Sequence, residues 1–155
     1  MATKTTLRAE VRRRRRARRA GTSALKAPFT PEFTPSPIPV RHRAEAEGIA
    51  RQIRALASSM GGVALPALFV STPLEPDMSL TLRLFERALL PVLLDEAGDT
   101  LGEPRWGLWE AGRALVRLGR PPAQPGGEAR GAESLKEADL IVIPALAASA
   151  DGTRL

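Results

Sequence analysis

The chain has 155 residues, with 23 Lys and Arg, 17 Asp and Glu, one His and no Cys. That length suits a single domain, and a hydrophobic content of 43% is enough to bury a core. The missing cysteines exclude a disulfide framework, a thiolate metal site and a cysteine nucleophile, and one histidine excludes a histidine cluster. No apolar run reaches the roughly 18 residues of a membrane span, and no apolar stretch follows the basic N-terminus as in a secretory signal. We therefore expect a cytoplasmic domain without a membrane partner.

The positive charge is concentrated at the N-terminus. Residues 1–43 carry 12 basic and 2 acidic side chains, whereas residues 44–155 carry 11 basic and 15 acidic ones. A basic arm on an acidic body indicates an anionic partner, such as nucleic acid, a lipid surface or a polyphosphate ligand. Arginines dominate the arm at positions 12–16, 18 and 19, and the alternative interpretation is a solvated basic helix face.

The first part of the chain predicts two helices separated by a proline-rich segment. A basic helix is expected within residues 1–20, over 3–19, where good helix formers dominate. Leu7 and Val11 give it a thin apolar stripe, so it must dock on something to persist. Five prolines between positions 28 and 39 predict a mobile loop over 21–40. A second helix is expected over 42–59, ended by Gly61-Gly62.

The remaining residues, 41–155, predict an α/β body. Apolar runs favour strands at 63–71, 90–94 and 139–144, with a shorter one at 105–109. Leu82, Phe85 and Leu89 favour a helix over 80–88 with Ser79 as its cap, and residues 112–134 are predicted to be mostly loop around 115–118. The run at 139–144 resembles a parallel strand covered on both faces. Strands alternating with helices predict a three-layer α/β/α domain with a mainly parallel sheet.

Two polar segments follow predicted strands and are candidate sites, because ligands of α/β sheets bind beyond the carboxyl ends of strands. Glu75 and Asp77 follow the strand at 63–71, although such a pair can also simply solvate the turn and cap the next helix. Residues 147–155 follow the strand at 139–144, although Asp151-Gly152 is also an ordinary turn pair. No GxGxxG or GxxxxGK[ST] phosphate loop is present.

Three motifs, in this order, resemble one enzyme family. Lys4-Thr-Thr-Leu7-Arg8 and the arginine-rich helix are similar to its K-x-x-L-R opening. Phe69-Val-Ser71 and then Glu75-Pro-Asp77 are similar to its strand and E-x-[DE]-T turn. The sequence DLIVIPALAASADGTRL at 139–155 resembles its D-L-[IV]-[IFL]-[VMI]-P-x-[LV]-[AG]-F-D-x-x-G-x-R-L-G motif, and LPVL at 90–93 resembles its L-P-V strand. The chain thus resembles the 5-formyltetrahydrofolate cyclo-ligase family, also called methenyltetrahydrofolate synthetase.

This resemblance implies an ATP-dependent ligase of one-carbon metabolism that converts 5-formyltetrahydrofolate to 5,10-methenyltetrahydrofolate. In the family the formyl oxygen is phosphorylated, the N10 nitrogen attacks and phosphate leaves, so ATP and Mg²⁺ are the implied cofactors. The resemblance assigns four residues to ATP, namely Lys4, Arg8, Arg154 and Leu155. It assigns Val70 and Glu75 to the folate, with Glu75 accepting hydrogen bonds from the pterin. It implies a monomer and assigns neither a catalytic residue nor a metal ligand in this chain.

The sequence departs from the family pattern at several positions. The family's Phe-Asp is Ala148-Ser149 here, and its Thr after E-x-D is Met78. The glycine-rich loop and metal-binding aspartate that follow R-L-G in the family are not among these 155 residues. We therefore expect residues 1–155 to be a single, C-terminally truncated cyclo-ligase domain that does not turn over by itself.

Two alternatives stay open. The arginines at 12–19 could serve a non-catalytic nucleic-acid-binding module with steeply salt-dependent affinity. That arm lacks aromatic residues for base stacking, which makes nucleic acid the weaker expectation. A degenerate homologue with an unrelated role is the other alternative, and Ala148-Ser149 is consistent with it.

Overall fold

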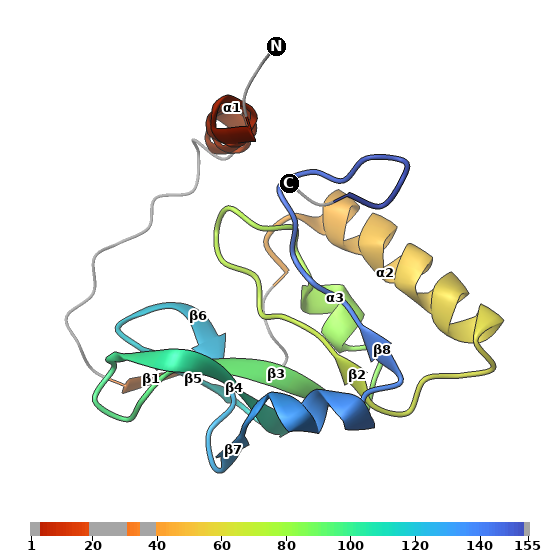
Figure 1. Ribbon diagram of the computed structural model, residues 1–155. Coiled ribbons are helices and arrows are strands. Elements are labelled where there is room, and N and C mark those ends of the chain that lie inside the picture. The colour runs from red at the N-terminus through yellow and green to blue at the C-terminus, as the bar shows by residue number, and fades with distance from the viewer. Residues whose placement is uncertain (1–3, 19–30, 35–39, 154–155) are drawn as a thin grey trace.

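The computed structural model describes residues 4–18, 31–34 and 40–153 (Figure 1). Its elements follow in the order α1 (Lys4–Arg18), β1 (Pro31–Thr34), α2 (Arg43–Ser59), β2 (Pro66–Ala67), α3 (Ser79–Leu82), β3 (Arg87–Leu94), β4 (Thr100–Glu110), β5 (Leu115–Leu118), β6 (Arg120–Gln124), β7 (Ala129–Arg130), the 3₁₀ helix η1 (Ala132–Glu137) and β8 (Leu140–Ile141). Within these residues, no helix is long and apolar enough to cross a membrane.

Two sheets form the body. The larger has the strand order β7-β4-β3-β2-β8, and the smaller has the order β1-β5-β6 with antiparallel pairing throughout. In the larger sheet β2 runs parallel to β3 and β8, whereas the β3–β4 and β4–β7 pairs are antiparallel. The α/β class is confirmed, but the sheet is mixed rather than mainly parallel.

The antiparallel half of the larger sheet arises from a hairpin whose two strands the sequence predicted separately, without their pairing. Residues 90–94 and 105–109 were expected as separate strands, and they are the two arms of the β3–β4 hairpin. Its turn is closed by the Asp95 N–H on the Asp99 oxygen at 2.9 Å and by the Gly98 N–H on the Asp95 oxygen at 3.0 Å. A connection this short can join only antiparallel neighbours, because a parallel crossover needs a dozen or more residues.

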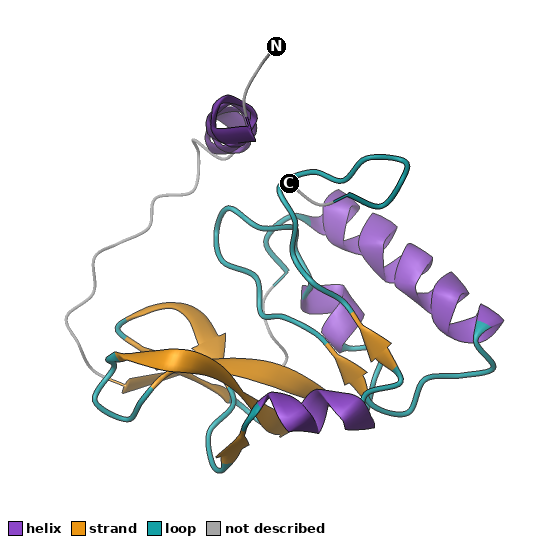
Figure 2. Cartoon of the chain, in the orientation of Figure 1, coloured by secondary structure: helices purple, strands orange, loops and turns teal. Residues whose placement is uncertain are grey.

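The helices cover the two faces of the larger sheet unequally. Figure 2 shows α2 and α3 together on one side, and among the described helices η1 alone packs on the other, against β4. One row across that second face joins Leu108, Leu89, Ala67 and Ile141 in register. The two inner residues are fully buried, whereas Leu108 is 49% exposed and Ile141 48% exposed. Among the described residues, the expected third layer is therefore confined to η1.

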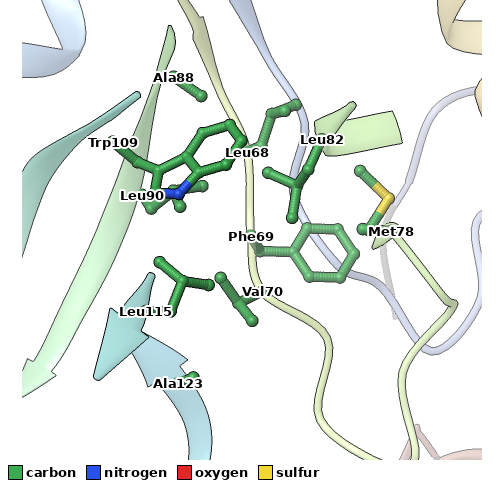
Figure 3. Close-up of a cluster of buried hydrophobic side chains, with 10 residues drawn as sticks. All are labelled: Leu68, Phe69, Val70, Met78, Leu82, Ala88, Leu90, Trp109, Leu115 and Ala123. Atoms are coloured by element: carbon green, nitrogen blue, oxygen red, sulfur yellow. The ribbon is translucent and has the colours of Figure 1, made fainter. Parts of the chain in front are cut away.

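The hydrophobic core lies between the first face of the sheet and the short helix α3 (Figure 3). Leu68, Leu90 and Trp109 contribute from the sheet side, while Met78 and Leu82 contribute from α3 and the residue before it. The indole N–H of Trp109 donates to the Arg113 carbonyl at 2.9 Å, which satisfies its one polar atom on burial.

The smaller sheet is tied to the end of β3 by one buried amide. Gln124 on β6 is 6% exposed, and its Oε1 accepts the main-chain N–H groups of Leu93 and Leu94 at 3.1 Å each. Its Nε2 donates to the Leu94 carbonyl at 2.8 Å. The side chain thus continues the hydrogen bonding of β3 where β4 diverges from it.

Both long helices agree with their predictions. The basic helix α1 spans Lys4–Arg18, and α2 ends at Ser59 before Gly61, whose φ of 81° suits a glycine C-cap. The mobile loop predicted for 21–40 is wrong at Pro31–Thr34, which pairs with β5 as strand β1. Residues 21–30 and 35–39 lie outside the described part.

Three predicted elements of the body are shorter than expected. The helix predicted for 80–88 is confined to Ser79–Leu82, because the chain from Arg87 onward joins the β3–β4 ladder. The strands predicted at 63–71 and 139–144 pair with neighbours over two residues each, Pro66–Ala67 and Leu140–Ile141. Residues 112–134 hold β5, β6 and β7 rather than mostly loop.

Replacing Gly107 by Ala is expected to destabilise the fold by about 1–3 kcal/mol through overpacking. A Cβ at this buried position on β4 would lie 2.8 Å from Cγ of Pro125 and 3.3 Å from Cγ2 of Val92. The proline ring is closed onto the main chain, so it cannot rotate to relieve the clash. Gly102 lies on the same strand, and a Cβ added there would meet nothing within 4 Å, so Gly102→Ala should change stability by less than about 0.5 kcal/mol. Urea unfolding of both variants measures the difference, and equal midpoints would contradict this prediction.

Candidate functional site

The site is built where two parallel strands end. β2 and β8 pair in parallel, with Pro66 opposite Leu140 and Ala67 opposite Ile141. Their carboxyl ends therefore meet at one edge of the sheet, the usual ligand side of an α/β sheet. Residues 68–78 leave from β2 and residues 142–153 leave from β8, so the two candidate segments of the sequence are neighbours in space.

The loop after β2 is closed by its own hydrogen bonds. The Glu75 Oε2 atom accepts the Thr72 N–H at 2.8 Å, and the Glu75 N–H donates to the Thr72 carbonyl at 3.2 Å. The Ser71 hydroxyl donates to the Pro76 carbonyl at 2.5 Å and accepts the Met78 N–H at 2.9 Å. The guanidinium of Arg41 donates to the Ser71 and Thr72 carbonyls at 3.1 and 3.2 Å. These hydrogen bonds within the protein hold the loop in one conformation without a ligand.

Asp77 is the centre of this arrangement and acts as a structural cap. The residue is 1% exposed, and its Oδ2 accepts the N–H groups of Arg41 and His42 at 2.8 Å each. Its Oδ1 accepts the Ser79 N–H at 3.0 Å, so Asp77, and not Ser79, serves the start of α3. Burial alone would raise the pKa of Asp77, but the N–H donors, that of His42 foremost, hold this pKa below its ordinary value.

The segment after β8 ends in a tight turn. The Ser149 hydroxyl and the Thr153 N–H both donate to Oδ1 of Asp151, the latter at 2.9 Å. These bonds, led by the one from Ser149, lower the pKa of Asp151. Gly152 adopts a φ of 85°, which confirms the turn predicted for Asp151-Gly152. Arg154 and Leu155, two of the four residues assigned to ATP, lie outside the described residues.

Arg15 of the basic helix contacts both segments. The Arg15 guanidinium donates to the carbonyls of Ala145 at 2.9 Å and Leu146 at 3.2 Å, both after β8. It also donates to the Leu74 carbonyl at 3.4 Å, in the loop after β2. In the apolar stripe of α1, Leu7 is 44% exposed and Val11 is half-buried. Figure 1 shows α1 beyond the ends of these loops.

Lys4 and Arg8 share the helix face that Arg15 turns toward the loops. Successive residues of an α-helix are rotated by about 100°. Arg8 lies seven positions before Arg15 and Lys4 eleven, so both side chains leave the helix within about 20° of the direction of Arg15. At 1.5 Å per residue they follow along the same side at about 10 and 16 Å from Arg15. Both side chains are exposed, as a cation that meets a soluble anion must be. Lys4, Arg8 and Arg15 therefore lie on one side of α1, the side that faces the loops after β2 and β8.

The opposite side of α1 carries an internal salt-bridge cluster. Glu10 accepts hydrogen bonds from Arg13 at 2.9 Å and from Arg14 at 2.6 Å. These bonds, Arg13 first, lower the pKa of Glu10 to about 2, so the carboxylate is ionised at neutral pH. Arg12 and Arg16, four positions apart, are exposed.

The two residues assigned to the folate differ in their surroundings. Val70 is 8% exposed and points into the core beside Leu115 (Figure 3). Glu75 is half-buried, and with Oε2 bonded to Thr72 its Oε1 is the atom left for a ligand donor among the described contacts. Sequence analysis missed Arg15, because nothing in a run of arginines distinguishes the one that docks. It missed Arg41, because the carbonyls that Arg41 binds lie 30 and 31 residues away in the chain.

The described residues offer no protein cage for a metal. Among them, no three His, Cys, Asp or Glu side chains are grouped to hold an ion. Asp77 and Asp151, the aspartates of the two candidate segments, are already bonded to main-chain N–H groups.

No protein-family model, curated protein or solved structure matches this chain in sequence or fold.

Proposed function

We propose that the chain forms the ATP- and folate-binding part of a 5-formyltetrahydrofolate cyclo-ligase, which makes 5,10-methenyltetrahydrofolate with ATP and Mg²⁺. The observation that carries this proposal is the Arg15 contact, because it brings the first and third motifs of the resemblance to the loop that holds the second. Three segments far apart in the sequence thus contribute to one edge of the sheet. Such a composite edge is the normal place for a ligand of an α/β protein.

The chemistry of the residues at this edge supports the assignment of ligands. Phosphoryl transfer depends on cations that position the phosphates and stabilise the developing charge, and Lys4 and Arg8 supply two on one helix face. The carboxylate of Glu75 is an acceptor, as the N–H donors of a pterin require. The proposal includes the family's three-layer fold, in which β3, β2 and β8 are the parallel part of the sheet.

ATP binding tests the proposal directly. Lys4→Ala and Arg8→Ala should each weaken ATP binding about tenfold to a hundredfold, since a charged hydrogen bond contributes roughly 1.5–3 kcal/mol. Calorimetric titration of the 155-residue chain with ATP measures this, and Glu75→Gln should weaken 5-formyltetrahydrofolate instead. Binding is the readout in these samples, because residues 1–155 are not expected to form the methenyl product by themselves.

Arg13→Ala is the matched control, because Arg13 lies on the far side of α1 and pairs with Glu10. It should leave ATP affinity unchanged. Equal ATP affinity in the wild type, Lys4→Ala and Arg8→Ala would contradict the proposal. Steeply salt-dependent oligonucleotide binding that is lost in an Arg12→Ser/Arg16→Ser variant, without ATP binding, would favour the nucleic-acid module instead.

A further inference from the structure

Arg41 contacts the loop after β2 at the peptide group that joins Ser71 to Thr72. Its guanidinium donates to the carbonyl of this peptide, that of Ser71, at 3.1 Å. The N–H of the same peptide, that of Thr72, donates to Oε2 of Glu75 at 2.8 Å. A peptide group is planar and almost always trans, so its carbonyl and its N–H point in opposite directions. Arg41 therefore holds one end of a rigid unit whose other end holds the Glu75 carboxylate.

The next peptide group connects Arg41 to Glu75 a second time. The carbonyl of Thr72 accepts the Glu75 N–H at 3.2 Å, which closes the turn, and it also accepts Nη2 of Arg41 at 3.2 Å. The same Nη2 atom bonds the Ser71 carbonyl. One nitrogen of Arg41 thus bonds both peptide groups to which Glu75 is bonded, one through the Glu75 side chain and the other through its main chain.

The positive charge of the guanidinium strengthens the hold on the carboxylate. A hydrogen bond to a carbonyl polarises its peptide group, and the N–H of that peptide becomes a better donor. The Thr72 N–H is consequently a stronger donor to Glu75 while Arg41 is in place. Ser71, Thr72 and Glu75 are each half-buried, so water replaces these bonds only in part. Removing the guanidinium should loosen the Glu75 carboxylate without removing any atom of Glu75 itself.

The main chain and the side chain of Arg41 have separate roles. The Arg41 N–H donates to Oδ2 of the buried Asp77 at 2.8 Å, and the His42 N–H donates to the same oxygen at 2.8 Å. A side-chain substitution at position 41 retains both of these main-chain donors. The contact of the guanidinium with the loop can therefore be removed while the hydrogen bonds of Asp77 remain.

We propose that Arg41 is a positioning residue that orients the Glu75 carboxylate for the pterin of 5-formyltetrahydrofolate. This inference rests on the proposed function, in which Glu75 accepts hydrogen bonds from the folate. Because the Thr72 N–H holds Oε2, the position of Oε1 depends on the orientation of the peptide between Ser71 and Thr72. Arg41 fixes that orientation through the two loop carbonyls, and it acts on the folate through Glu75.

Titration of the 155-residue chain with 5-formyltetrahydrofolate measures the effect on binding. Arg41→Ala should weaken the affinity about threefold to tenfold, because its side-chain bonds are exposed and lie at the lower end for charged hydrogen bonds. Arg41→Lys should restore part of the affinity, since an ammonium also carries several donors for the two carbonyls. Arg43→Ala is the matched control, because Arg43 is an exposed arginine that pairs with Glu47 on its own helix. It should leave the affinity unchanged.

Amide hydrogen exchange distinguishes positioning from general stabilisation and needs no ligand. Arg41→Ala should accelerate exchange of the Thr72 N–H about threefold to tenfold and leave that of the His42 N–H unchanged. Equal acceleration at both amides would show that the side chain only stabilises the fold, and would overturn the inference. Folate binding that Arg41→Ala does not change would overturn the role of Arg41 alone. A wild type that binds no 5-formyltetrahydrofolate would contradict the proposed function and this inference together.

Discussion

Replacing Asp77 by Ala should destabilise the protein by about 3 kcal/mol, a large share of the stability of a small domain. Three main-chain N–H groups, those of Arg41, His42 and Ser79, donate to this one carboxylate at 2.8, 2.8 and 3.0 Å. Truncation leaves them unsatisfied in a place that water reaches poorly, because Asp77 is 1% exposed. Urea unfolding followed by circular dichroism measures the loss.

The structure offers a matched control for Asp77 in Asp139. Oδ2 of Asp139 also accepts two main-chain N–H groups, those of Ala64 and Leu65, at 2.8 Å each. Asp139 is exposed, so water can replace its carboxylate, and Asp139→Ala should cost about 1 kcal/mol or less. If the two alanine variants lost the same free energy of unfolding, burial would not be the reason for the role of Asp77.

The contribution of Asp77 should also depend on pH in a defined direction. Its pKa is lowered in the folded protein, so its contribution is fully present above the unfolded pKa of about 3.9. It is lost as the pH falls through the lower, folded pKa. Asp77→Asn keeps the size of the side chain but cannot ionise, so its stability deficit relative to the wild type should shrink below about pH 4. A deficit that stays constant from about pH 7 to about pH 3 would contradict this.

The role of Asp77 illustrates how far local sequence reasoning reached. The position of Glu75 and Asp77 after a strand predicted a functional loop, and the alternative prediction of a turn and helix cap proves correct for Asp77. The donors Arg41 and His42 are 36 and 35 residues away in the chain. No local pattern reports such a contact, so the sequence could indicate a cap but could not show that it joins two helices.

The strand and helix predictions failed where tertiary pairing outweighs local preference. Leu82, Phe85 and Leu89 have helical spacing, yet Leu89 lies in β3, paired with Ala67 on one side and Leu108 on the other. Two ladders and full burial stabilise Leu89 more than a few residues of helix propensity could. The long helices α1 and α2 were predictable because each extends over many turns with few competing partners.

Replacing Arg15 by Ala should release α1 from the body. Three carbonyls, those of Leu74, Ala145 and Leu146, would lose their donor. The apolar stripe of α1 is thin, with Leu7 44% exposed and Val11 half-buried. A free helix of this length with a run of like charges is marginal in water. Hydrogen exchange of the α1 amides should therefore accelerate about tenfold to a hundredfold, as expected for losing roughly 1.5–3 kcal/mol.

Two further variants separate docking from charge. Arg16→Ala removes the same charge from an exposed neighbour and should leave the exchange of α1 unchanged. Arg15→Lys keeps the charge, but an ammonium cannot reproduce the planar fork across three carbonyls, so its exchange should fall between wild type and Arg15→Ala. Because Lys4 and Arg8 share the docked face, Arg15→Ala should also weaken ATP binding although it touches no ligand in the proposed site. Accelerated exchange with unchanged ATP affinity would mean that Lys4 and Arg8 act without being positioned by the helix, and unchanged exchange would show that Arg15 does not anchor α1.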